Sequence, residues 1–406
     1  MGRSDARLGT RSLARMAIAS MVVFAAVVVL GGCGARDRGS PSQSWSGVAV
    51  DGESAFVGTS DGRIVQIRLL DVGGETVPQP GQTFGPPEIE RNATQAAFYG
   101  TPIVEGGRLY VGSYHGVAYS MRADGAGVLE DVREFPVDGN PLSESIAGSV
   151  ASSDGALVIA ASEDAGEGRL YVLEASRLDD GLSALQVERC RYPRSDLEPI
   201  GQLWTTPTVV EGVAYFGDLS HRVYAVSIDD CRLVWNAPAE VGGAVVAPPV
   251  VVGNKIYLGA LDRVFYEIDR ATGAVRVLLT ADGWFWARAA TDGRRVYAPT
   301  LDGTLYGYDT RDRTFWTYQE GDPQPILSAP VVVGDKVVMA SDSGAVTLLS
   351  AGGTRLDSRL VKGGKVRAPI TVRDDVVYVH SLDEIITALR VDGDRLVTEW
   401  EFDVSG

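Results

Sequence analysis

Cys190 and Cys231 are two of the three cysteines in this chain of 406 residues, and they could form a disulfide. Two cysteines in a folded body that lies in an oxidising compartment favour such a bond. The alternative is two separate thiols. Cys190 is expected on the outer strand of one repeat and Cys231 in a turn of the next, toward opposite faces, whereas a disulfide needs Cα atoms roughly 5.5 Å apart. The sequence leaves both interpretations open.

The other residue types that carry out acid–base or metal chemistry are few and scattered. His115, His221 and His380 fall in separate repeats, so we expect turn or strand residues, although His115 and His221 could share a channel mouth. Four aspartates recur at one turn position: Asp61, Asp262, Asp302 and Asp383. They could attract cations, but aspartate is favoured in such turns for backbone reasons alone. With so few soft ligands we expect no metal and no cofactor.

The third cysteine, Cys33, follows a segment with the features of an export leader. Four arginines precede Met16, and residues 16–30 are uncharged. Gly31 and Gly32 let an extended segment enter a peptidase cleft, after which the Cys33 thiolate could accept a lipid. The run from Leu30 to Cys33 resembles the lipobox of bacterial lipoproteins. The alternative is an uncleaved membrane anchor, because residues 16–34 approach the roughly 20 residues that span a bilayer.

These features predict three segments. Residues 1–32 are expected to be a lipoprotein signal peptide, and residues 33–44 a flexible, polar tether from the lipidated cysteine. Residues 45–406 are expected to fold. Both interpretations of the leader place this body outside the cytoplasm, attached to the cell membrane or the outer membrane.

The overall composition excludes one large class of partner. Hydrophobic residues make up 45% of the chain and charged residues 22%, which is typical of a folded globular protein. Acidic residues outnumber basic ones by 53 to 37, for a net charge of −16. Such a surface repels the phosphate backbone that supplies most nucleic-acid affinity, so we expect no nucleic-acid partner.

The elements that position these residues recur about every 40 residues. Each repeat has a short strand, a turn and a second strand with a hydrophobic anchor; the eight anchors are Phe56, Tyr110, Val158, Tyr215, Tyr257, Tyr297, Val338 and Tyr378. The last four intervals are 42, 40, 41 and 40 residues, and the first three are 54, 48 and 57. This period, with four short strands per unit, predicts an all-β, eight-bladed propeller with four-stranded antiparallel blades.

The first strand of most repeats is preceded by proline, which is tolerated where a strand begins or has an open edge. Three positions before the proline, or its equivalent, every repeat has an apolar residue: Trp45, Tyr99, Ala147, Trp204, Val246, Trp286, Leu327 and Val366. This regularity favours packing between neighbouring blades over a ligand-binding platform.

Two segments resemble a known repeat. Ala225 to Trp235 has the Ala-to-Trp spacing of the tryptophan-docking motif of quinoprotein propellers, and Asp269 to Gly273 has its Asp-x-x-Thr-Gly turn, although Trp316 and Trp400 fall one and two positions off that register. The chain thus resembles the PQQ-like β-propeller repeat family and, with the lipobox, the BamB group of outer-membrane assembly lipoproteins. The resemblance implies a non-catalytic scaffold that binds an envelope protein complex, such as a β-barrel assembly machinery.

Quinoprotein dehydrogenases have an adjacent cysteine pair over the cofactor and a Glu, Asn and Asp set that binds Ca²⁺. This sequence has no adjacent cysteines and no recognisable set of this kind. We therefore expect no enzyme activity, and a PQQ-dependent dehydrogenase is the weakest hypothesis. A stronger alternative to the scaffold is a propeller that binds or senses a small molecule or glycan at its channel mouth.

Two regions are candidates for partner binding. The extra length of repeats one to three includes residues 78–87, 162–168 and 191–203, and the last of these contains Tyr192 and Arg194. Insertions on one side of a ring suggest a contact surface, whereas neutral variation in loops is the alternative. The second region is Trp284, Phe285 and Arg288, because aromatic residues beside arginine are typical interface anchors.

Overall fold

The structure is a computed structural model that describes residues 45–86, 97–125, 128–137, 142, 145–163, 167–175, 185–194 and 200–405. All of these residues belong to one compact unit, Pro41–Gly406. Cys33, the expected signal peptide and the tether lie outside the described residues. In the described part of the chain, no helix has the length and apolar character needed to cross a membrane.

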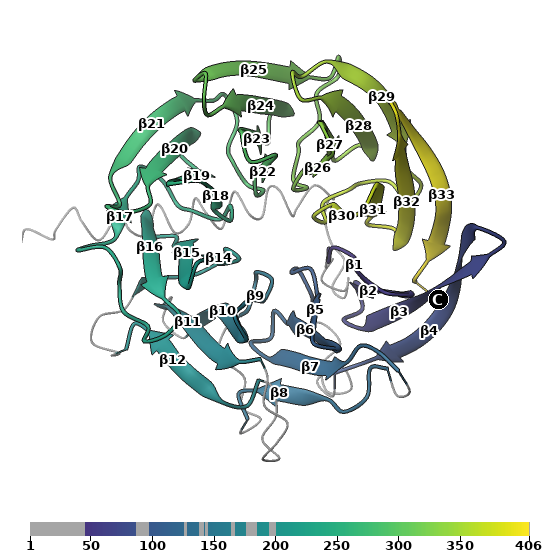
Figure 1. The fold of residues 1–406 in the computed structure, drawn as a ribbon, viewed down its shortest axis with the longest axis horizontal. Helices are drawn as coiled ribbons and strands as arrows, with labels where there is room; N and C mark the ends of the chain where they lie inside the picture. Colours follow the sequence, from purple (N-terminus) through teal and green to yellow (C-terminus); the bar gives the residue numbers. More distant parts are fainter. Residues whose placement is uncertain are drawn as a thin grey trace, which may run out of the picture. The chain divides into compact units, whose positions relative to one another are not determined.

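The described residues form eight antiparallel sheets arranged around a common centre (Figure 1). The strands of the first four blades are β1 Ala49–Asp51, β2 Ser54–Gly58, β3 Ile64–Val72 and β4 Glu75–Phe84; β5 Ile103–Glu105, β6 Arg108–Gly112, β7 Ala118–Arg122 and β8 Arg133–Phe135; β9 Ala151–Ser153, β10 Ala156–Glu163, β11 Glu167–Glu174, β12 Glu188–Tyr192 and the additional β13 Ile200–Gly201; β14 Thr208–Val210, β15 Val213–Gly217, β16 Arg222–Ser227 and β17 Ala239–Glu240.

The last four blades have the same organisation. Their strands are β18 Val250–Val252, β19 Lys255–Gly259, β20 Val264–Asp269 and β21 Val275–Thr280; β22 Ala290–Thr291, β23 Arg295–Pro299, β24 Thr304–Asp309 and β25 Thr314–Gln319; β26 Val331–Val333, β27 Lys336–Ala340, β28 Ala345–Ser350 and β29 Arg355–Leu360; β30 Thr371–Arg373, β31 Val376–His380, β32 Ile385–Asp392 and β33 Arg395–Asp403.

The repeat predicted from the sequence is confirmed. All eight hydrophobic anchors lie on the second strand of a blade, and the prolines at 102, 207, 249, 330 and 369 immediately or nearly precede an innermost strand. The chain is an all-β, eight-bladed propeller with four-stranded antiparallel blades, one of which carries β13 as a fifth strand.

The hydrophobic core is divided among the interfaces between blades. The described residues form eight buried clusters, and each joins two neighbouring blades, the cluster between blades 8 and 1 included. The second and third strands are therefore covered on both faces, and four of the five residues of β19 are buried. The outermost strands form the rim and are more exposed, as β21 shows.

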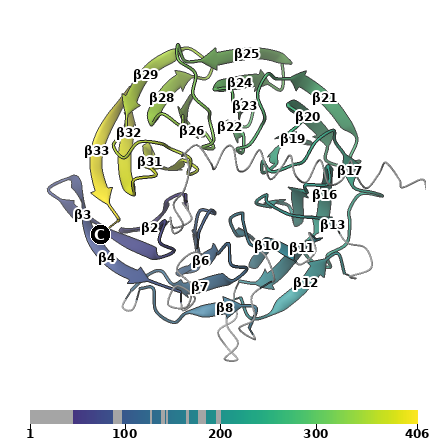
Figure 2. The ribbon, with the colours of Figure 1, turned by 180° about the vertical axis from the view of Figure 1, so that it is seen from behind.

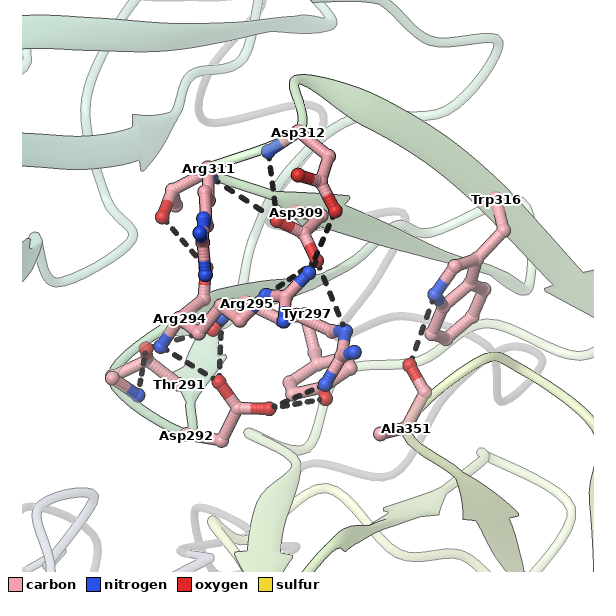
Figure 3. Close-up of polar contacts among 12 residues, drawn as sticks. Thr291, Asp292, Arg294, Arg295, Tyr297, Asp309, Arg311, Asp312, Trp316 and Ala351 are labelled. Atoms are coloured by element: carbon pink, nitrogen blue, oxygen red, sulfur yellow. Dashed lines mark hydrogen bonds and ion pairs between the residues drawn. The ribbon is translucent and has the colours of Figure 1, made fainter.

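Tryptophans on the rim fasten neighbouring blades together. The indole N–H of Trp235 donates to the carbonyl oxygen of Arg270 in the next blade at 2.9 Å, and that of Trp316 donates to Ala351 at 3.1 Å (Figure 3). Each ring packs on a glycine with positive φ, and a Cβ on Gly353 would lie 2.5 Å from Trp316 Cε3. Trp316 thus docks as Trp235 does, despite its shifted position in the sequence.

Blade 8 meets blade 1 without exchange of a strand, because its sheet consists of the consecutive strands β30 to β33. In both views β33 runs beside β4 at this junction (Figures 1 and 2). The hydroxyl of Thr371 donates to the Val48 carbonyl at 2.6 Å, and the Ser60 amide donates to Glu384 Oε1 at 2.7 Å. Side-chain and backbone contacts therefore close the ring within the described residues.

Candidate functional site

The innermost strands surround a central cavity of about 660 Å³. All eight blades contribute to its wall, mainly through the segments that lead into these strands. The wall has three large aromatic side chains, Trp45, Tyr99 and Trp286, and two charged ones, Arg288 and Arg367. None of the described residues that line the cavity is an aspartate or glutamate, so its fixed charge is positive.

Some of the eight apolar residues predicted to pack between blades also face the cavity. Val246, Leu327 and Val366 are buried, and Leu327 also lines the cavity with the half-buried Trp45, Tyr99 and Trp286. The rings of Trp45 and Tyr99 meet edge to face, with centroids 4.9 Å apart. These residues therefore offer an aromatic wall to a ligand as well as packing within the ring.

The protein around the cavity affects its titratable groups. Removal from water, assisted by the neighbouring Tyr114, raises the pKa of Tyr99 to about 12. The same desolvation lowers the pKa of the Arg288 guanidinium below its ordinary value. Because an arginine pKa starts so high, Arg288 remains a cation at neutral pH, and Tyr99 remains a neutral phenol.

Arg367 is a charged wall residue that sequence reasoning missed. Its Nε–H donates to Asp342 Oδ1 at 2.8 Å, and its guanidinium lies 5.9 Å from the centroid of the Trp45 ring. Only 6% of the residue is exposed. The carboxylate of Asp342 balances its charge, and the Trp45 face adds a cation–π contact.

The second region predicted to bind a partner consists of Trp284, Phe285 and Arg288, and these three side chains have different surroundings. Trp284 lies in the segment between β21 and β22 and is 37% exposed, whereas Phe285 is 1% exposed. Phe285 packs on Phe265 with ring centroids 5.4 Å apart, so it belongs to the core between blades 5 and 6 and offers no surface to a partner. Arg288 faces the cavity. The structure thus separates residues that the sequence grouped.

Part of the extra length of the first three blades, where loops were expected, forms strand, whereas residues 87, 164–166 and 195–199 lie outside the described residues. Residues 78–84 belong to β4, Ser162 pairs with Gly168 across the β10–β11 hairpin, and Ile200 begins β13. Tyr192 is half-buried against Tyr224, with ring centroids 5.8 Å apart, whereas Arg194 is exposed. Of these two candidates, Arg194 is the side chain that faces solvent.

Cys190 and Cys231 form a disulfide, with their Cα atoms 5.7 Å apart. The expectation that they lie toward opposite faces is therefore wrong. Cys190 is on β12, the outer strand of blade 3, and Cys231 is in the turn after β16 in blade 4. An outer strand thus reaches the corresponding turn of the next blade, which is also where the docked tryptophans make their contacts.

Asp302 and His380, two of the scattered polar candidates, have structural contacts. Asp302 accepts hydrogen bonds from Thr300 and Thr304 within its own turn, and none of the four repeated aspartates is a lining residue of the cavity. His380 is buried at the junction of blades 8 and 1, with Nε2 3.2 Å from Glu384 and Nδ1 2.9 Å from the Ser46 carbonyl oxygen. Over the described residues, no cluster of three or more histidine, cysteine or acidic side chains could hold a metal ion.

Comparison with protein families gives a consistent result. The family described as "Outer membrane protein assembly factor BamB" matches residues 191–292 and 219–363. The chain is 27% identical over 164 residues to the outer membrane protein assembly factor BamB of Yersinia pestis. The aligned region covers 37% of this chain and 38% of that protein. It is 23% identical over 205 residues to BamB of Alkalilimnicola ehrlichii, covering 46% of this chain and 51% of that one. The chain therefore spans about half or less of each curated relative.

Solved structures share the fold over nearly the whole chain. BamB from Moraxella catarrhalis superposes with a TM-score of 0.62 at 15% identity, covering 85% of this chain and 96% of that one. Sqt1 of Saccharomyces cerevisiae superposes with a TM-score of 0.63 at 10% identity, covering 89% of this chain and 96% of that one. At these identities the structural likeness shows the fold alone, and the sequence matches point to BamB. The chain is a BamB-like PQQ β-propeller.

Proposed function

We propose that this protein is a non-catalytic, protein-binding scaffold of the cell envelope that takes part in the assembly of outer-membrane proteins. The observation that carries the proposal is the sequence likeness to BamB of two organisms. It falls on a propeller in which the described aspartate Asp302 hydrogen-bonds within its own turn and His380 joins blades 8 and 1. A rigid ring with variable loops is well suited to hold a partner, because its core does not depend on loop sequence.

Trp284 is the candidate anchor for such a partner. It is a large aromatic side chain, 37% exposed, on a short segment whose backbone is fixed by the Leu301 amide, which donates to the Trp284 carbonyl at 2.9 Å. Exposed tryptophans on ordered backbone lose little entropy on binding and are enriched among interface residues that dominate affinity. Arg194, exposed after β12, is the second candidate.

The sequence supports attachment of the propeller to a membrane through Cys33. A lipid on this cysteine and the polar residues 34–44 would hold the ring near a membrane surface while leaving it free to reorient. Such a location fits a component of an outer-membrane assembly complex. It also concentrates the propeller near its partner and so compensates for a modest intrinsic affinity.

The test is affinity purification of the full-length, C-terminally tagged protein from its native membranes after mild crosslinking, followed by mass spectrometry. We expect recovery of a β-barrel assembly component in near-stoichiometric amount. Recovery of the propeller without any outer-membrane assembly component would overturn the proposal.

Two variants test whether the partner binds at Trp284 or is recovered without a specific docking site. Trp284→Ala removes the candidate anchor, whereas Phe315→Ala removes a 41% exposed aromatic side chain from the rim strand β25. We expect recovery of the partner to fall by about tenfold or more for Trp284→Ala and to change little for Phe315→Ala. Equal losses in both variants would contradict a docking site at Trp284.

A further inference from the structure

Arg288 occupies a position at which every other blade has a small residue or proline. Two residues after the apolar position of the repeat, the other seven blades have Gly47, Thr101, Ser149, Thr206, Pro248, Ala329 and Ala368. The ring is tightly built here, since the Thr101 amide donates to Ser149 Oγ and the Ser149 amide donates to Thr206 Oγ1, both at 2.8 Å. An arginine at this position is therefore not needed for the architecture of a blade.

Arg367 provides an internal comparison. It lies one position earlier in the repeat, where the other blades have Ser46, Gly100, Gly148, Thr205, Ala247, Ala287 and Ser328. Arg367 is buried, bonded to Asp342 and stacked over Trp45. The fold thus accommodates one arginine of the channel wall by pairing it with a carboxylate.

Arg288 has no such partner. It is exposed to the cavity, and its guanidinium forms no hydrogen bond or ion pair with any described residue. Nearby protein atoms reduce the hydration of the guanidinium and so lower its pKa. Because no described protein group accepts from its N–H donors, they are available to an anion that enters the cavity.

The charge of the cavity is opposite to that of the whole chain. The chain has a net charge of −16, yet the charged residues that line the cavity are Arg288 and Arg367, and Asp342 already pairs with Arg367. The cavity of about 660 Å³ has the size of a small-molecule site. Its aromatic wall of Trp45, Tyr99 and Trp286 suits an apolar or flat body.

We propose that the central cavity binds a small organic anion, with its carboxylate or phosphate group on the Arg288 guanidinium and its body against the aromatic wall. The planar guanidinium presents paired N–H donors that match either oxyanion. This site is separate from docking at Trp284, so the proposal is independent of the scaffold function.

The experiment uses three probes that share one aromatic body: benzoate, phenyl phosphate and neutral benzamide. Each is titrated into the full chain, and binding is measured by ligand-observed NMR with competition between probes. We expect at least one of the two anions to bind at least about tenfold more tightly than benzamide, because a charged hydrogen bond to the guanidinium is available only to the anions. The stronger of the two anions identifies the headgroup class.

Three variants assign the binding to the site. Arg288→Ser introduces the residue type of the other blades, so we expect it to fold and to lose the preference for anions, whereas Arg288→Lys should retain part of it. Arg232→Gln removes a side chain that is 73% exposed on the rim and should bind as the parent does. The proposal is overturned if neither anion outcompetes benzamide, or if folded Arg288→Ser binds the anions as tightly as the parent.

Discussion

At the scale of single residues, neighbours in the sequence have separate roles. Trp284 is exposed, Phe285 is buried between two blades and Arg288 faces the central cavity. A strand or an extended segment sends successive side chains to opposite sides, so proximity in sequence does not predict a shared surface. Composition alone shows three candidates for one interface, whereas the backbone assigns them to a surface, a core and a cavity.

Phe285→Ala tests this separation. We expect a loss of about 3 to 5 kcal/mol in the free energy of unfolding, because the ring leaves a cavity in the core between blades 5 and 6. Trp284→Ala is the matched control and should cost about 1 kcal/mol or less, since its side chain is partly in solvent. Urea denaturation gives both values, and equal losses would contradict the assigned burial.

Asp309 illustrates a residue whose charge stabilises a turn. The Arg294 guanidinium, whose Nε–H donates at 2.8 Å, together with the backbone amides of Asp312 and Arg311, lowers the pKa of Asp309 to about 2 (Figure 3). An unfolded aspartate has a pKa of about 3.9. The charged form is therefore favoured in the folded state, and its stabilisation is present above pH 4 and is lost as the pH falls toward 2.

Asp309→Asn should accordingly be less stable than the parent at pH 7, and the difference should shrink as the pH is lowered through the range from about 4 to 2. Thermal melts of both proteins across this range measure the effect. Asp322→Asn, which alters an aspartate for which the structure gives no ion pair, is the control. A difference that does not depend on pH would contradict the assigned role.

At the scale of elements, contacts from the outer part of one blade to the turn after the third strand of the next blade recur in the ring. Trp235 and Trp316 reach this turn by hydrogen bonding and packing on glycine, and Cys190 reaches it by a disulfide to Cys231. Between blades 7 and 8, Arg359 on β29 donates at 3.1 Å to the carbonyl of Leu396, just beyond this turn at the start of β33. Hydrogen bonds, packing on glycine and a disulfide therefore all join the outer part of one blade to the next blade.

A pair of glycine variants tests the tryptophan contact. Gly353 and Gly293 both have φ 85°, but a Cβ on Gly353 would collide with the Trp316 ring, whereas a Cβ on Gly293 meets no atom within 4 Å. Replacement of either by alanine incurs the same kind of backbone strain. We expect Gly353→Ala to cost roughly 1 to 3 kcal/mol more than Gly293→Ala, from overpacking against the indole. Equal denaturation midpoints would show that the ring does not dock there.

The sequence predicts the buried inner strands better than the exposed outer strands. The second strands were identified because both faces of each are buried, which produces a short, almost continuous apolar run. Residues 78–84 were expected to be loop because proline and glycine are rare in strands, yet β4 is an outer strand whose open edge tolerates proline. The disulfide could not be decided, because it depends on how far an outer strand reaches past the next blade.

The candidate site shows a similar limit. Arg288 was identified from its aromatic neighbours, and its position in the cavity was not predicted. Arg367 was missed, although alignment of the eight repeats marks both arginines as exceptions at positions that are otherwise small or proline. The internal repeat therefore contained the signal, but the neutralisation of Arg367 by Asp342 requires the three-dimensional arrangement of blades 7 and 8.

At the scale of the whole molecule, the ring combines a repeated core with features that are not repeated. Every interface between blades has its own hydrophobic cluster, which makes the propeller a stable frame. The exposed Trp284 and the Arg288 side chain in the cavity do not recur from blade to blade. These features are where a function specific to this protein is to be sought.

Cys33→Ser tests the attachment of the propeller to a membrane. Without a thiol to accept a lipid, the tagged protein should move from the membrane fraction to the soluble fraction, as an immunoblot after ultracentrifugation would show. Retention in the membrane fraction would favour an uncleaved hydrophobic anchor formed by residues 16–34.

The most direct test of the scaffold is site-specific photo-crosslinking in native membranes. A photoreactive amino acid is introduced at Trp284 or, as a control, at Phe315 on the rim, and crosslinked products are identified by mass spectrometry. We predict a crosslink from position 284 to an outer-membrane assembly component, with little or none from position 315. The absence of such a crosslink from position 284, or equal crosslinking from both positions, would contradict the account.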